Sequence, residues 1–231
     1  MVAATLRRLN WPLIALLVVL LAAQGMIGGM VRKVPPQYHI LAAPPGKAGF
    51  AAQSMGDLQF GFRMASLRLQ HVGSLDGRIF PFRKIDYGRL SRWFALLDDV
   101  DPAPSIVPTM AAFLFVSTQN PSDTRYLVDY LEKHALRDPS IKWRWLAQAV
   151  HIAWYQLGDR PRALALAKEL AGLPVADLPY WARQMPAFIL LDMGEKQSAR
   201  AILEAIAKTD KNLPDNERKW MAHYIKRHLQ D

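Results

Sequence analysis

The hydrophobic and polar positions of this chain begin with one continuous apolar run, from Trp11 to Val31. The run contains no charged residue, and Gln24 is its one polar side chain. A helix rises about 1.5 Å per residue, so a run of this length crosses the ~30 Å hydrocarbon core of a bilayer. Basic residues flank both of its ends: Arg7, Arg8, Arg32 and Lys33. The pattern predicts a membrane anchor over residues 1–33, a single transmembrane helix that contacts lipid through residues 11–31.

A cleaved signal peptide is the alternative interpretation, because a basic start and an apolar core are typical of both. Ala23-Gln24-Gly25 offers small residues at the positions that a signal peptidase recognises. However, the apolar character continues through Met26, Ile27 and Met30, which a cleaved peptide does not need. The sequence favours the uncleaved anchor over cleavage, and both over a buried core helix.

The proline and glycine content of residues 34–56 predicts a linker, because prolines stiffen a chain into extended segments and glycines let it bend. No compact structure is expected there. The residues that carry this prediction are Pro35, Pro36, Pro44, Pro45, Gly46 and Gly49.

Helical periodicity dominates from Asp57 onward, and strand-like alternation is nearly absent. A mostly apolar quartet with spacing 0, 3, 4, 7 recurs four times, at offsets of 37, 36 and 36 residues. This spacing places four side chains on one face of a helix. The quartets are Leu90, Trp93, Phe94, Leu97; Leu127, Tyr130, Leu131, His134; Ala163, Leu166, Ala167, Leu170; and Ala199, Ile202, Leu203, Ile206. The pattern predicts an all-α domain of helical repeats over residues 57–231.

Turn residues recur with the same period. Pro102, Pro139 and Pro174 come after three of the quartet helices, where proline blocks further helix. Gly158 and Gly194 lie five residues before a quartet, where a left-handed glycine lets one helix turn back into the next. Each repeat is therefore predicted to contain a helix, a tight turn and a second helix.

These features resemble the tetratricopeptide (TPR) superfamily, with Gly158 and Gly194 at the turn, Ala163 and Ala199 five positions later, and prolines at the ends of repeats. The resemblance implies a solenoid of about four helix pairs that binds peptides or proteins, and it covers residues 105–208 best. The period departs from the roughly 34 residues of a standard repeat, and the usual Leu-Gly pair is missing. Pro186 is expected to interrupt and kink a first helix.

The last predicted helix, about residues 214–229, has one apolar and one charged face, as expected of a capping helix at the end of a stack. Glu217 belongs to its predicted outward face. Its predicted inward side chains are Trp220, Met221, Tyr224 and Ile225.

Charge and composition argue against some classes of function. The net charge is +9, but five basic residues and no acidic ones precede Asp57, which leaves 24 basic and 20 acidic residues in the domain. This mixed surface does not indicate nucleic-acid binding. The absence of cysteine excludes disulfides, thiolate chemistry and Cys-ligated zinc.

No catalytic, cofactor-binding or metal-binding motif is recognisable, and the six histidines are scattered. We interpret His134 and His151 as packed or hydrogen-bonded residues inside helices. We interpret Asp98, Asp99 and Asp101 as a solvated turn before a proline rather than as a metal site. The sequence therefore predicts a protein that is not an enzyme and holds no cofactor.

A partner-binding groove is predicted on the first helices of two pairs, because their tryptophan and glutamine recur at an offset of 36 residues. Tryptophan offers a rigid face and glutamine an amide that bonds a peptide backbone, a combination found at interface anchors. Arg144 and Arg183 stand beside the tryptophans and are able to meet a carboxylate. The alternative is that both tryptophans only pack between neighbouring helices. The predicted groove residues are Trp145, Gln148, Tyr155, Trp181, Gln184, Arg144 and Arg183.

A second predicted surface is a basic cluster in and after the loop at residues 73–85. It is suited to lipid head groups or an acidic partner, and a merely solvated loop is the alternative. Its members are Arg78, Arg83, Lys84, Arg89 and Arg92.

The leading hypothesis is a membrane-anchored scaffold that binds other proteins of the membrane or envelope during assembly or maturation of an envelope complex. The alternative is a fixed structural subunit of a larger membrane enzyme or secretion machine. A short basic start before an apolar core is typical of segments that direct the rest of the chain across a membrane. We therefore expect a single pass through a bacterial inner membrane, with the repeat domain in the periplasm.

Overall fold

A computed structural model describes residues 11–32, 40–75, 78–118, 120–210 and 213–229. Most of these residues lie in helices, which confirms the predicted all-α class at this level. The chain divides into two compact units, Met1–His39 and Ile40–Asp231. We call the second the folded unit.

In the first unit, α1 (Trp11–Arg32) is a continuous helix without an acidic residue in its first turn. Its large apolar side chains, such as Leu17 and Val19, are exposed. Within the described residues it is the one helix long and apolar enough to cross a membrane. This confirms the predicted N-terminal apolar helix.

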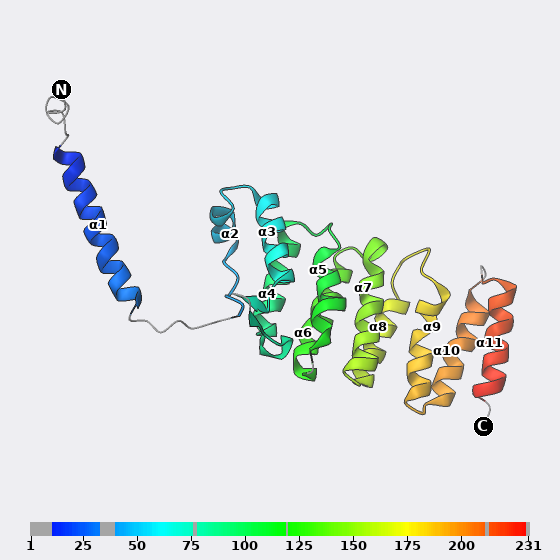
Figure 1. Ribbon diagram of the computed structural model, residues 1–231. Coiled ribbons are helices and arrows are strands. Elements are labelled where there is room, and N and C mark those ends of the chain that lie inside the picture. The colour runs from blue at the N-terminus through cyan, green and yellow to red at the C-terminus, as the bar shows by residue number, and fades with distance from the viewer. Residues whose placement is uncertain (1–10, 33–39, 76–77, 119, 211–212, 230–231) are drawn as a thin grey trace. The chain divides into compact units, whose positions relative to one another are not determined.

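In the folded unit, helices that are consecutive in the chain pack against one another, from α6 to α11 without a break (Figure 1). The helices are α2 (Lys47–Gln53), α3 (Leu58–Gln70), α4 (Tyr87–Val100), α5 (Ile106–Thr109), α6 (Pro121–Leu136), α7 (Pro139–His151), α8 (Arg160–Ala171), α9 (Tyr180–Asp192), α10 (Lys196–Thr209) and α11 (Asp215–His228). The shorter elements are the strands β1 (Ser74–Leu75) and β2 (Arg78–Ile79), the 3-10 helices η2 (Phe82–Lys84) and η4 (Phe115–Ser117), and the π-helices η3 (Met110–Leu114) and η5 (Ile152–Gln156). The two strands pair as an antiparallel hairpin in the predicted loop.

The four quartets lie on α4, α6, α8 and α10 and face the core, as predicted. Thirteen of their sixteen side chains are buried, and Trp93, Ile202 and Ile206 are partly buried. The recurring apolar spacing thus becomes the packing face of these four helices, because residues at 0, 3, 4 and 7 share one side of a helix.

The predicted glycine turns are confirmed. Gly158 and Gly194 adopt φ angles of +65° and +83°, a conformation that strains residues with a Cβ. Helix α9 continues through Pro186, which is buried in the protein, so the predicted interruption does not occur.

The predicted linker is wrong for residues 40–56, because this segment packs onto the folded unit. Leu41 and Phe50 are buried in its core. Nε1 of Trp93 donates a hydrogen bond of 2.8 Å to the carbonyl oxygen of Ala42. A Cβ at Gly61 would lie 2.8 Å from Cβ of Ser54, so glycine permits α3 to approach this segment closely. Residues 34–39 lie outside the described part of the chain.

The last helix differs from its prediction at two positions. Met221 is buried and Tyr224 and Ile225 are partly buried, but Trp220 is 42% exposed. Glu217, expected to point outward, accepts a hydrogen bond from Gln184 and is partly buried.

Two hydrophobic clusters hold the folded unit together. The larger extends from Leu41 to Ile189. The smaller joins α9, α10 and α11, and its buried members are Ala187, Leu190, Ala199, Leu203, Leu213, Met221 and Leu229.

Candidate functional site

The two tryptophans predicted as equivalent groove residues have different surroundings. Trp145 is partly buried, and its ring lies 6.3 Å from that of His134. Trp181 is 49% exposed, and its ring lies 5.8 Å from that of Trp143, which is buried. Trp143 was not among the predicted site residues, and the signal for it was the Trp143-Arg144-Trp145 sequence itself.

The two predicted glutamines also differ. Gln184 is buried, and its Nε2 donates a hydrogen bond of 2.7 Å to Oε1 of Glu217. Gln148 is partly exposed. Glu217 lies 33 residues after Gln184, and the corresponding position after Gln148 is Trp181, which offers no acceptor. Gln184 therefore ties α9 to α11 and is not available to a partner.

The two arginines predicted for the groove also have different surroundings. Nη1 of Arg183 lies 2.9 Å from Oδ2 of Asp210, an ion pair within the chain. Arg144 is exposed, and its guanidinium carbon lies 5.1 Å from the centre of the Trp143 ring, a cation–π contact. The buried Trp143 ring thus contacts both Arg144 and Trp181, and we call these three residues the tryptophan patch.

Tyr155, the remaining predicted groove residue, lies on the π-helix η5. Its exposed ring stacks on that of Trp154 with 4.6 Å between the centres. Nε1 of Trp154 donates a hydrogen bond of 3.0 Å to Oδ2 of Asp192. This bond and the ion pair with Arg160 lower the pKa of Asp192.

Only some of the side chains predicted to form the basic surface are exposed. Arg83, Lys84 and Arg92 are exposed. Nε of Arg89 lies 3.1 Å from Oδ2 of Asp86, and Arg89 also donates to the carbonyl oxygen of Leu41. Arg89 therefore has a structural role in holding the segment before α2. The side chain of Arg78 lies outside the described part of the structure.

The interpretation of Asp98 as part of a solvated turn is wrong. Asp98 is buried on α4 and faces two residues of α6. Its Oδ1 accepts a hydrogen bond of 3.0 Å from the Tyr130 hydroxyl, and its Oδ2 lies 2.6 Å from Nδ1 of His134. Burial, together with the charge of Asp98, raises the pKa of Tyr130. The interpretation of His134 as a hydrogen-bonded core residue is confirmed.

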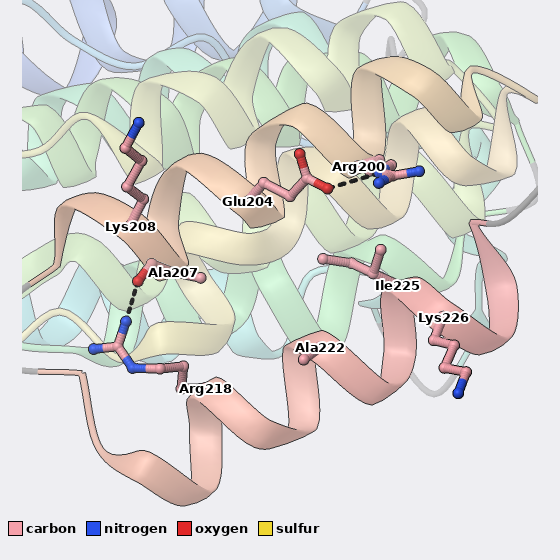
Figure 2. A pocket seen from close by; sticks show the side chains of 8 residues that line it. All are labelled: Arg200, Glu204, Ala207, Lys208, Arg218, Ala222, Ile225 and Lys226. Atoms are coloured by element: carbon pink, nitrogen blue, oxygen red, sulfur yellow. Dashed lines mark hydrogen bonds and ion pairs between the residues drawn. The ribbon is translucent and has the colours of Figure 1, made fainter.

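An open groove of about 490 Å³ lies between α10 and α11. Figure 2 shows the side chains that line it. Arg200 and Lys208 stand two turns apart on α10, with Glu204 between them. Nε of Arg200 lies 2.7 Å from Oε1 of Glu204, and Arg218 donates to the carbonyl oxygen of Ala207. Sequence reasoning missed this groove, although its signal is visible as basic residues eight positions apart on both helices. The residues that line it are Arg200, Glu204, Ala207, Lys208, Arg218, Ala222, Ile225 and Lys226.

Among the described residues, no group of three or more histidine or acidic side chains is arranged to hold a metal ion. No protein-family model, curated protein or solved structure matches this chain. The chain's own residues are therefore the basis for proposing a function.

Proposed function

We propose that this chain is a membrane-anchored, TPR-like scaffold that binds partner proteins and is not an enzyme. The tryptophan patch is the observation that carries the proposal. Trp181 is half exposed yet held against Trp143, so its large apolar face meets a partner without being reordered. Rigid tryptophan and arginine side chains are typical of the residues that dominate binding energy at interfaces.

The charge of the patch indicates the partner chemistry. Arg144 makes no ion pair with a side chain in the described ranges, and it contacts the same Trp143 ring that Trp181 contacts. An arginine in such surroundings binds carboxylates through paired hydrogen bonds. The expected partner segment therefore offers an apolar side chain for Trp181 and an acidic group for Arg144.

The spacing of side-chain hydrogen bonds supports the TPR-like arrangement. His134 bonds to Asp98 across 36 residues, Trp154 to Asp192 across 38, and Gln184 to Glu217 across 33. Bonds at about one period are expected when each repeat contacts only its neighbours. The glycine turns and buried quartets fit the same scheme of helix pairs.

The proposed setting is a bacterial inner membrane, with α1 as a single pass and the folded unit in the periplasm, where it supports assembly or maturation of an envelope complex. Protease added to spheroplasts tests the orientation. We expect digestion of the folded unit while cytoplasmic proteins survive. Resistance until the cells are lysed would reverse the orientation.

Affinity capture tests the binding function. The full chain is solubilised in mild detergent and compared with Trp181→Ala and Arg144→Glu variants. Tyr126→Ala is the matched control, because Tyr126 is a similarly exposed aromatic residue on α6. We expect one specific protein to be lost from both patch variants and kept by the control. Equal recovery with all variants would reject the patch as the binding site.

A further inference from the structure

Helix α3 exposes an apolar stripe. Phe60, Met64 and Leu67 are 48%, 50% and 49% exposed. They lie four and three residues apart, so they share one side of the helix. The opposite side carries Phe62 and Leu69, which are buried in the core. The helix is thus held firmly by one face and leaves a second apolar face uncovered within the folded unit.

Arginines border this stripe on both sides. With about 100° between successive residues of a helix, Arg63 falls on one flank and Arg68 on the other. Both are exposed, and α3 contains no acidic residue. The carboxylate of Asp57, just before the helix, caps it by accepting a hydrogen bond from the amide of Phe60. We call Phe60, Arg63, Met64, Leu67 and Arg68 the α3 outer face.

An apolar stripe between cations is the pattern of a helix that lies in a membrane interface. The apolar side chains enter the boundary of the acyl chains, while arginines keep their charge among the phosphates. Two copies of this chain would fit less well, since face-to-face packing would gather four arginines without an acidic residue from either α3.

The chain keeps the folded unit close to a bilayer if α1 spans one. The folded unit begins at Ile40, eight residues after the end of α1 at Arg32. Even fully extended, that distance is at most about 30 Å. Helix α3 packs against α2, the first helix of the folded unit.

We propose that the α3 outer face docks on the surface of the bilayer that α1 crosses, through contacts with acyl chains and anionic head groups. This rests on the membrane anchor of the proposed function and adds a second contact that fixes the folded unit against the lipid. It is independent of the tryptophan patch.

The chain contains no cysteine, so single spin labels are introduced without background. A nitroxide is attached to Met64→Cys in the full chain, inserted into lipid nanodiscs that contain phosphatidylglycerol. Ala201→Cys is the control, because Ala201 is exposed on α10. Electron paramagnetic resonance measures collisions with oxygen, which concentrates in lipid, and with a water-soluble nickel chelate. We expect the label at 64 to show a several-fold higher ratio of oxygen to nickel collisions than the label at 201.

A label at 64 as open to the nickel chelate as the label at 201 would overturn the proposal. So would a label shielded from both agents, which indicates protein cover, or dipolar broadening between two labelled chains. A label at Leu67→Cys gives the same measurement should the first variant fail to fold.

The Arg63→Glu and Arg68→Glu double variant tests the role of charge. We expect its label at 64 to return to water, whereas Lys133→Glu with Lys168→Glu, at exposed sites on α6 and α8, leaves the label in lipid. An unchanged label in the double variant would overturn the part assigned to head groups. If α1 is not a membrane span, the chain does not enter nanodiscs at all, and this outcome is distinct from insertion with a water-exposed label.

Discussion

Nδ1 of His134 lies 2.6 Å from Oδ2 of Asp98, and these two buried side chains are 36 positions apart in the sequence. The Tyr130 hydroxyl donates to the other oxygen of the same carboxylate. One buried acidic group therefore joins α4 to two successive turns of α6. Buried polar groups are costly when they lose a partner, so this contact ties the positions of the two helices to each other.

Replacing Asp98 should destabilise the protein strongly. Asp98→Ala leaves the Tyr130 hydroxyl and the His134 ring without their acceptor in the core. We expect the free energy of unfolding to fall by about 3–5 kcal/mol, the usual cost of breaking a buried charged contact. Chemical denaturation followed by circular dichroism measures it. Asp177→Ala, at an exposed loop position, should change it little, and equal effects of the two changes would contradict this role.

The packing of residues 40–56 is testable at Phe50. Phe50→Ala removes a buried ring, and we expect a loss of about 3–5 kcal/mol of unfolding free energy. Ala52→Ser, at an exposed site on the same helix, is the control. A thermal denaturation midpoint unchanged by Phe50→Ala would mean that this segment is a linker after all.

The turn glycines provide a test of backbone strain. An alanine at Gly158 or Gly194 meets no neighbouring atom, so its cost comes from the positive φ alone. We expect each change to remove about 1–2 kcal/mol of stability. Gly46 also has open space, but its φ is −62°, and Gly46→Ala should be nearly neutral. Similar denaturation midpoints for all three variants would refute the strain.

The tryptophan patch separates stability from binding. Trp143 is buried, and Trp143→Ala should cost about 3–5 kcal/mol. Trp181 is half exposed, and Trp181→Ala should cost only about 1–2 kcal/mol. Urea denaturation of the two variants gives the comparison. A loss of folding in Trp181→Ala would support the alternative that this residue only packs between helices.

The pH dependence of stability is expected to involve Asp99. Hydrogen bonds from Arg137 and Lys47 hold the pKa of Asp99 below its ordinary value. Its folded-state pKa is thus below its unfolded one, so its contribution is present above the unfolded pKa and is lost as pH falls through the folded pKa. Asp99→Asn should lower the thermal midpoint at neutral pH, and the difference from the parent should vanish in acid. A difference that stays constant with pH would exclude this titration.

From Asp57 onward, the sequence predicted the helical class, the buried helix faces and the glycine turns, because the signals for them are local. The quartets fix the buried face of α4, α6, α8 and α10 through spacing alone, and Gly158 and Gly194 mark the turns. The folding of residues 40–56 was not predictable in this way. Leu41 and Phe50 pack against residues much later in the chain. The prolines and glycines around them are typical of a linker, so the local sequence does not indicate that these two residues are buried.

The candidate site was harder to predict than the fold. Identical residues 36 positions apart were expected to have the same role, but an environment also depends on the neighbouring helix. Gln184 bonds to Glu217, whereas the residue at the same spacing after Gln148 is Trp181. Trp181 in turn rests on Trp143 and not on a groove of its own. Periodicity identifies the helix face but not the partner across it.

The smaller hydrophobic cluster of α9, α10 and α11 has a consequence for the dynamics of the chain. Because α10 and α11 place their buried apolar side chains in this smaller cluster and not in the larger one, they are able to open together while the remainder stays closed. In native-state amide hydrogen exchange, the protons of α10 and α11 would then exchange as one group, ahead of those in α4 and α6. Occupation of the groove between α10 and α11 would slow that exchange, so a ligand at the end of the chain would be detected first as local protection and not as a change in shape.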